Sequence, residues 1–113
     1  MKYLLIICAD ESVELTPQEQ AAVQSGTESW VAEMDARGVR SQGDRLRPVS
    51  DATTVRVRDQ EVLITDGPFA ETKEQIAGYD ILECVDLDEA NEVAAKHPVA
   101  RYGVIEVRPF WPA

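Results

Sequence analysis

The sequence contains few of the residues that most often carry catalysis or bind metal ions. Its 113 residues include one histidine and two cysteines, and aromatic residues make up 6% of the chain. One histidine among scattered carboxylates gives no zinc-like ligand spacing, and no Cys-x-x-Cys pair is present. We therefore expect neither a metal ion nor a cofactor. Cys8 and Cys84 both lie in apolar runs and are expected to be reduced thiols of the core.

Basic residues are few as well. The chain has 11 Lys and Arg against 21 Asp and Glu, which gives a formal net charge of −10. Nucleic-acid backbones are bound through clustered Lys and Arg, whereas the arginines between residues 40 and 58 alternate with acidic residues. That mixture predicts solvated strand faces, and the charge balance disfavours an anionic membrane surface. We expect no nucleic acid and no membrane as partners.

The apolar run at the N-terminus is short. It meets Asp10 and Glu11 directly, without a small-residue cleavage site, so it predicts a buried strand rather than a secretory signal. A cytoplasmic location is the corresponding expectation. Gly and Pro are spread along the chain with no linker, repeat or low-complexity tract, which predicts one domain over residues 1–113.

Two helices are predicted from their capping signals. Thr16-Pro17-Gln18-Glu19 combines an N-cap threonine, a proline at the first helical position and a glutamate three residues after the cap. The helix is expected to run to about Arg37 and to end at Gly38. Asp86 followed by Glu89 predicts a second helix that runs to His97 and is stopped by Pro98.

The strands and helices together predict an α+β fold, a ferredoxin-like sandwich with an added β-hairpin. Two helices can cover only one face of the sheet, yet the first strand is apolar at almost every position, so its other face must also be buried. We expect a homodimer that packs sheet against sheet. The predicted strands are Lys2–Ala9, a weak Val39–Val49, the hairpin Thr53–Arg58 and Glu61–Thr65, Gly78–Val85 and Tyr102–Arg108.

Several motifs along nearly the whole chain resemble one protein family. They are DGPFAETKE at Asp66–Glu74, Gly78-Tyr79, DLDEA at Asp86–Ala90, His97-Pro98 and EVRP at Glu106–Pro109.

On these motifs the chain resembles the DGPF branch of the YCII-related family. The resemblance implies a ferredoxin-like protomer that assembles as a dimeric α/β barrel, in agreement with the burial argument. Most of the family is uncharacterised, although one relative in aromatic catabolism is a dehydrochlorinase. A His–Asp pair proposed as catalytic in the narrower YCII branch has its histidine near the first helix, where this sequence reads TESWVAEM. DGPF-branch proteins are often encoded beside extracytoplasmic-function sigma factors, which implies a regulatory context.

His97 is the only histidine and a candidate general acid or base. On a helical wheel it lies with Leu87, Ala90 and Ala94 on the face turned to the sheet, in the last helical turn, where partial negative charge favours imidazolium. Two interpretations stay open. His97 is either a C-terminal cap packed against the sheet edge or a catalytic residue in a cleft between helix and sheet.

Asp66 is the second candidate catalytic residue. An aspartate before glycine commonly initiates a turn, but Gly67 and Pro68 make this loop stiff enough to hold a carboxylate in a site. Phe69 is either a core anchor or a substrate platform.

Three further polar residues are candidate substrate contacts. Glu71 and Thr72 face either solvent or a pocket mouth, and Tyr79 is either a half-buried strand residue or a hydrogen-bond donor to a ligand. The aromatic tail at residues 109–112 is expected to pack on the partner subunit, with a lid over a ligand as the alternative.

Two functions follow from these candidates. The first is a cofactor-independent small-molecule enzyme of lyase or isomerase type, with Asp66 or His97 as general base in a cleft between sheet and helices. The alternative is a non-catalytic dimeric module that binds a small ligand or a regulatory partner associated with sigma-factor signalling.

Overall fold

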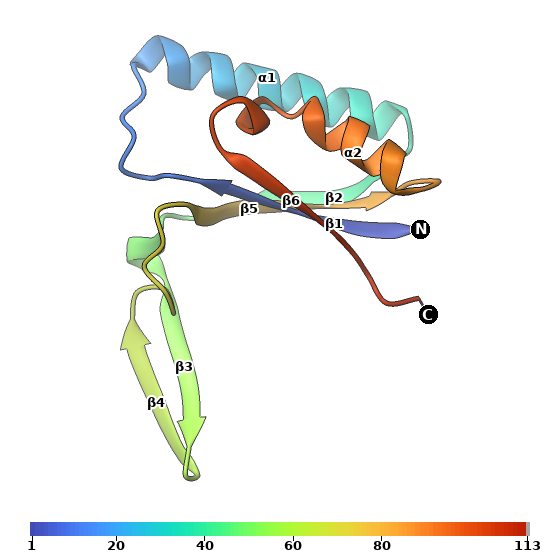
Figure 1. The fold of residues 1–113 in the computed structure, drawn as a ribbon. Helices are drawn as coiled ribbons and strands as arrows, with labels where there is room; N and C mark the ends of the chain where they lie inside the picture. The colour runs from blue at the N-terminus through green and yellow to red at the C-terminus, as the bar shows by residue number, and fades with distance from the viewer. Residues whose placement is uncertain (113) are drawn as a thin grey trace.

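A four-stranded antiparallel sheet forms the centre of the protein, and two helices cover one of its faces (Figure 1). The structure, a computed structural model, describes residues 1–112. The sheet order is β2-β5-β1-β6, and this arrangement is compatible with the predicted ferredoxin-like sandwich. The elements are β1 (Lys2–Ala9), α1 (Pro17–Ala36), β2 (Arg40–Arg45), η1 (Val49–Asp51), β3 (Thr53–Arg58), β4 (Glu61–Asp66), β5 (Gln75–Glu83), α2 (Leu87–Ala95), η2 (Pro98–Arg101) and β6 (Val104–Pro109).

The first helix forms where its capping signal predicts it. The Thr16 hydroxyl accepts a hydrogen bond from the Glu19 amide at 3.1 Å, and the Glu19 carboxylate accepts one from the Thr16 amide at 3.0 Å. This reciprocal pair satisfies two amides that have no partner inside the helix. The helix ends just before Gly38, whose φ of 72° is the left-handed conformation that glycine adopts most readily.

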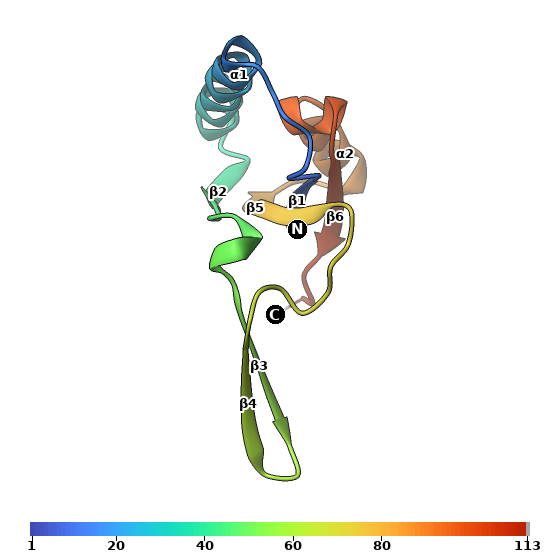
Figure 2. The ribbon, with the colours of Figure 1, turned by 90° about the vertical axis from the view of Figure 1, so that its left-hand side faces the viewer.

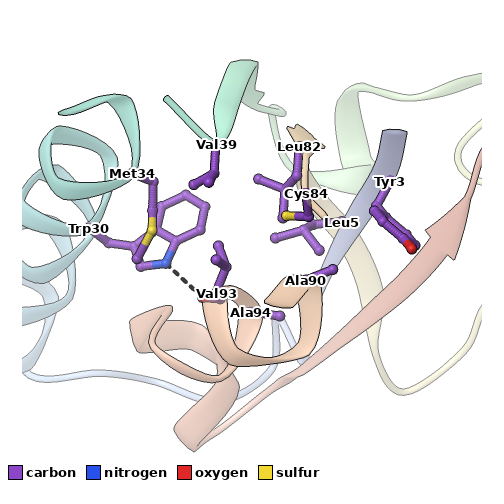
Figure 3. Packing of buried hydrophobic residues seen from close by; sticks show 10 residues of the cluster. All are labelled: Tyr3, Leu5, Trp30, Met34, Val39, Leu82, Cys84, Ala90, Val93 and Ala94. Carbon is purple, nitrogen blue, oxygen red and sulfur yellow. Dashed lines mark hydrogen bonds between the residues drawn. The ribbon is translucent and has the colours of Figure 1, made fainter. Parts of the chain in front are cut away.

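The core lies between the helices and the side of β1 that faces them (Figure 3). Tyr3 and Leu5 are buried on that side of β1, and Trp30 and Met34 are the buried residues of α1. The Trp30 indole donates a hydrogen bond to the Val93 carbonyl at 2.9 Å, so the two helices are joined by a polar contact as well as by packing.

The second helix is shorter than predicted. It ends at Ala95 with Lys96 as its cap, so His97 lies outside the helix and the prediction that it occupies the last helical turn is wrong. A residue that precedes proline is disfavoured in the helical region, and His97 accordingly has an extended backbone before Pro98. The helical wheel also predicted that Leu87 faces the sheet, and this is wrong because its side chain is exposed.

A buried ion pair lies on the helix side of the sheet. Arg40 donates from Nε to the Asp80 carboxylate at 2.8 Å, and it also reaches Asp35 at 3.2 Å. Asp80 is only 5% exposed, and burial raises the pKa of its carboxyl although the bond from Arg40 opposes the rise. A side chain on Gly43, opposite Asp80, would clash with this carboxylate. The prediction that the arginines all lie on solvated faces is therefore wrong for Arg40.

The other side of the sheet is not covered by any helix within the described residues (Figure 1). Leu4 and Ile6 of β1 lie there, opposite Ile81 and Tyr79 of β5. These four side chains are half-buried in the single chain. We call this surface the open sheet face. Its margins are polar, with Asp44 on β2 and the ion-paired Glu106 and Arg108 on β6.

The predicted hairpin is confirmed, but it stands apart from the main sheet. β3 and β4 form a separate two-stranded sheet, joined by a turn in which Asp59 and Gln60 have φ of 51° and 67°. We call residues 53–66 the arm. It extends away from the sheet on the side opposite the helices (Figures 1 and 2). The radius of gyration is accordingly 16.0 Å, against roughly 13 Å for a compact domain of this length.

Candidate binding cleft at the base of the arm

An open cleft of about 530 Å³ lies where the arm joins the sheet. Three segments meet there, namely the loop after β1, the short helix η1 and the loop from 67 to 75. The volume is within the range of small-molecule sites. The lining residues are Asp10, Glu11, Ser12, Val49, Ser50, Gly67, Pro68, Glu71, Thr72, Lys73 and Gln75.

Side-chain hydrogen bonds hold the walls of this cleft together. The Glu11 carboxylate accepts from the Val49 amide at 3.2 Å, which ties the loop after β1 to η1. The Gln75 amide donates to the carbonyls of Ala70 at 3.0 Å and Thr72 at 3.1 Å. Because Gln75 is also the first residue of β5, it fixes the loop to the sheet. The cleft is therefore held by contacts within the chain, as a preorganised site requires.

Gly67 makes the junction between arm and cleft rigid. Its amide donates to the Ala52 carbonyl at 2.8 Å, and its own carbonyl accepts from the Thr54 hydroxyl at 2.8 Å. Its φ of 94° is a backbone conformation that residues with a side chain rarely adopt. Gly67 directly follows the arm and lines the cleft, so one strongly constrained residue connects the two.

The cleft has an acidic lining. The Asp10 carboxylate accepts from the Ser12 hydroxyl at 2.6 Å and from the Ser12 amide at 2.9 Å. The hydroxyl bond, followed by the amide bond, lowers the pKa of Asp10 below its ordinary value, so this carboxyl is ionised at neutral pH. Asp10, Glu11 and Glu71 bring three carboxylates to the cleft, against the single ammonium group of Lys73.

The structure brings together only part of the predicted site. Glu71 and Thr72 line the cleft, whereas Phe69 is 76% exposed and does not anchor in the core of the chain, so that interpretation was wrong. Tyr79 is half-buried on the open sheet face, as the strand interpretation predicted. Asp66 is the exposed last residue of β4 and is not part of the cleft lining.

His97 lies on the helix side of the protein, away from the cleft lining. It is 3% exposed, and its ring meets that of Trp30 edge-on with 4.7 Å between the centroids. Its Nδ1 accepts from the Val99 amide at 3.1 Å and so caps η2. Burial lowers the pKa of His97 to about 4, so the imidazole is neutral at pH 7, contrary to the imidazolium expected from a helix end.

A second, smaller cavity of about 360 Å³ lies between α2, η2 and β6. Acid–base chemistry was predicted in a cleft between sheet and helices, but neither His97 nor Asp66 is among the residues that line this cavity. Its lining is mostly alanine and valine, and Asn91 supplies the one side-chain amide. The lining residues are Asn91, Ala94, Ala95, Ala100, Gly103, Val104, Ile105 and Val107, and none of them titrates.

The two cysteines are separate free thiols. Cys84 is buried in the core, where burial raises its pKa to about 11, and Cys8 is partly buried. Among residues 1–112, no three His, Cys, Asp or Glu side chains are grouped so that they could hold a metal ion.

No helix in that part of the chain is long and apolar enough to cross a membrane.

Sequence reasoning did not assign Asp10, Glu11, Ser12 or Gln75 to a site. The pairing of Ala9 with Gln75 brings the end of β1 to the start of β5, and these residues are more than sixty positions apart in the chain. A signal was nevertheless present, because two carboxylates follow the central strand directly at its end.

Comparison with known proteins supports the resemblance at the level of the YCII-related domain, without distinguishing its DGPF branch. The family model of the YCII-related domain matches residues 1–113. An uncharacterized protein of Rhizobium meliloti (strain 1021) is 36% identical over an alignment length of 104 residues, and the match covers 77% of this chain and 84% of that protein.

Proposed function

The chain belongs to the YCII-related family, and from this premise we propose that it is a homodimeric module that binds a small, positively charged molecule in the cleft at the base of the arm. The observation that carries the proposal is the cleft itself, whose walls are held by Glu11 and Gln75 and whose volume suits a small ligand.

The preference for a cation rests on the charges in the lining. Three carboxylates and one ammonium group leave a formal charge of −2 on the lining side chains (−3 + 1). Asp10 keeps its charge because Ser12 stabilises the carboxylate, and a bound cation would neutralise the excess. Hydroxyls of Ser50 and Thr72 offer hydrogen bonds that would orient the ligand.

The proposal of a homodimer is based on the open sheet face. Its apolar centre at Leu4, Ile6 and Ile81 has polar margins, which is the composition of a protein interface. The C-terminal tail runs to the same side of the sheet, and its Trp111 is 95% exposed in the single chain (Figure 1). A second copy packed on this face would cover both surfaces.

Putrescine, a small diamine, should bind the protein with a dissociation constant in the millimolar range or below, as measured by isothermal titration calorimetry. Glu71→Gln removes one carboxylate from the cleft and should weaken binding several-fold, because one ion pair is lost. Glu28→Gln, an exposed change on α1, should bind like the wild type.

Succinate serves as the anionic probe and should bind more weakly than putrescine. Equal binding of the two probes, or equal affinity of both variants and the wild type for putrescine, would contradict the assignment of the ligand to this cleft.

Catalysis by Asp66 and His97 stays a prediction with less support. The Nδ1 of His97 already accepts a hydrogen bond, and its pKa near 4 makes it a weak base. Tyr79 and Phe69 likewise stay candidate ligand contacts. Tyr79 lies on the open sheet face, which a second subunit would cover. None of the surfaces described above points specifically to a sigma-factor partner.

A further inference from the structure

We propose that the apolar face of the arm packs against a second copy of this chain, which makes the arm a second part of the dimer interface. The inference rests on the proposed dimer and adds a contact that the open sheet face alone does not supply.

The arm has two chemically different faces. In its register Val55 lies opposite Ile64 and Val57 opposite Val62, so all four β-branched side chains project from one face. Each of the four is between 57 and 66% exposed. The opposite face carries mainly Thr, Arg and Glu side chains, at positions 54, 56, 58, 61 and 65, together with Leu63.

The apolar face of the arm is expected to be buried by another surface. A two-stranded hairpin is at best marginally stable in water when its apolar side is exposed. The hydrogen bonds of Gly67 hold the arm only at its base, and the exposed fractions show that the rest of the chain leaves the four side chains largely in contact with water. A contiguous group of exposed branched side chains marks an interaction surface.

The direction and length of the arm favour a second copy as the cover. The arm leaves the sheet on the same side as the open sheet face, opposite the helices (Figures 1 and 2). Its strands have six residues each, which span about 20 Å at roughly 3.4 Å per residue. Two packed sheets lie only about 10 Å apart. The arm would therefore extend past the sheet of a copy packed on the open face and along its flank.

Two-fold symmetry makes the contact reciprocal, because each copy would receive the arm of the other. Gly67 and Pro68 belong both to the root of the arm and to the wall of the cleft. Docking of the arm on the partner would thus brace the cleft that we assign to ligand binding.

Ile64→Lys and Thr65→Lys form a matched pair for the test. The two positions are adjacent on β4 but lie on opposite faces of the arm. Ile64→Lys should weaken dimerisation at least about tenfold in sedimentation velocity, because it places a charge in each of two buried contacts. Thr65→Lys should change the dissociation constant less than about threefold. Near-UV circular dichroism from buried Trp30 checks that the main fold persists.

Hydrogen exchange gives a second measurement on the wild type. The amides of residues 55–64 should be protected in the dimer and should exchange much faster after dilution below the dissociation constant. Equal effects of the two variants, or arm amides that exchange equally fast in dimer and monomer, would overturn the proposal. If the dimer persisted unchanged in Ile64→Lys but dissociated in Ile81→Lys, the proposed arm contact would be excluded. The proposed sheet-to-sheet dimer would then still stand.

Discussion

Arg40→Ala should lower the free energy of unfolding by about 3–5 kcal/mol, the cost of leaving a buried charge without its partner. The Arg40 side chain is 13% exposed and that of Asp80 7%, so little water replaces the lost guanidinium. Arg40 also donates to the Gly43 carbonyl at 3.1 Å, and that bond would be lost too. Urea denaturation followed by far-UV circular dichroism measures the change.

Two variants control for the mechanism. Arg37 pairs with Glu92 at 3.4 Å on the surface, so Arg37→Ala should cost less than about 1 kcal/mol. Arg40→Met combined with Asp80→Leu removes both charges and should recover most of the loss. If Arg40→Ala cost no more than Arg37→Ala, the ion pair would not be the buried, mutually dependent contact described above.

Acidification from pH 7 to pH 4 should destabilise the wild type by on the order of 3 kcal/mol more than His97→Gln. Burial lowers the pKa of His97 in the folded protein from 6.5 to about 4. Between these values the unfolded chain binds more protons than the folded one, so stability is fully present above pH 6.5 and is lost as the pH falls toward 4.

The glutamine variant isolates this effect because the other acidic and basic groups are common to both proteins. Loss of the Trp30 contact lowers the stability of His97→Gln at every pH, whereas its pH profile should be flatter. Urea unfolding at several pH values between 4 and 7 gives both profiles. Parallel profiles for the two proteins would show that His97 is not held neutral by burial.

The sequence predicted elements whose signals are local. Thr16, Pro17 and Glu19 specify the start of α1 because all three act within one helical turn. The alternation of Thr53–Arg58 and the apolar run within Glu61–Thr65, separated by Asp59 and Gln60, predicted the hairpin for the same reason. The end of the second helix was missed by two residues because the effect of Pro98 reaches back to His97, which removes that residue from the helix.

The candidate site was less predictable because it depends on long-range register. Glu71 and Thr72 were identified from a motif, but their partners across the cleft come from the other end of a strand pairing, near Asp10. Arg40 and Asp80 likewise are forty residues apart and become an ion pair only when β2 aligns with β5. Local sequence patterns therefore predict single helices and strands. A site built from distant residues can be predicted only when the pairing of the strands is known.

The central claim is that a second copy of the chain covers the open sheet face. Sedimentation equilibrium at micromolar concentration tests it most directly, with Ile81→Lys on that face and Ser29→Lys on exposed α1 as the matched variants. We predict twice the mass of one chain for the wild type and for Ser29→Lys, and the mass of one chain for Ile81→Lys. A wild-type protein with the mass of a single chain at this concentration would contradict the account.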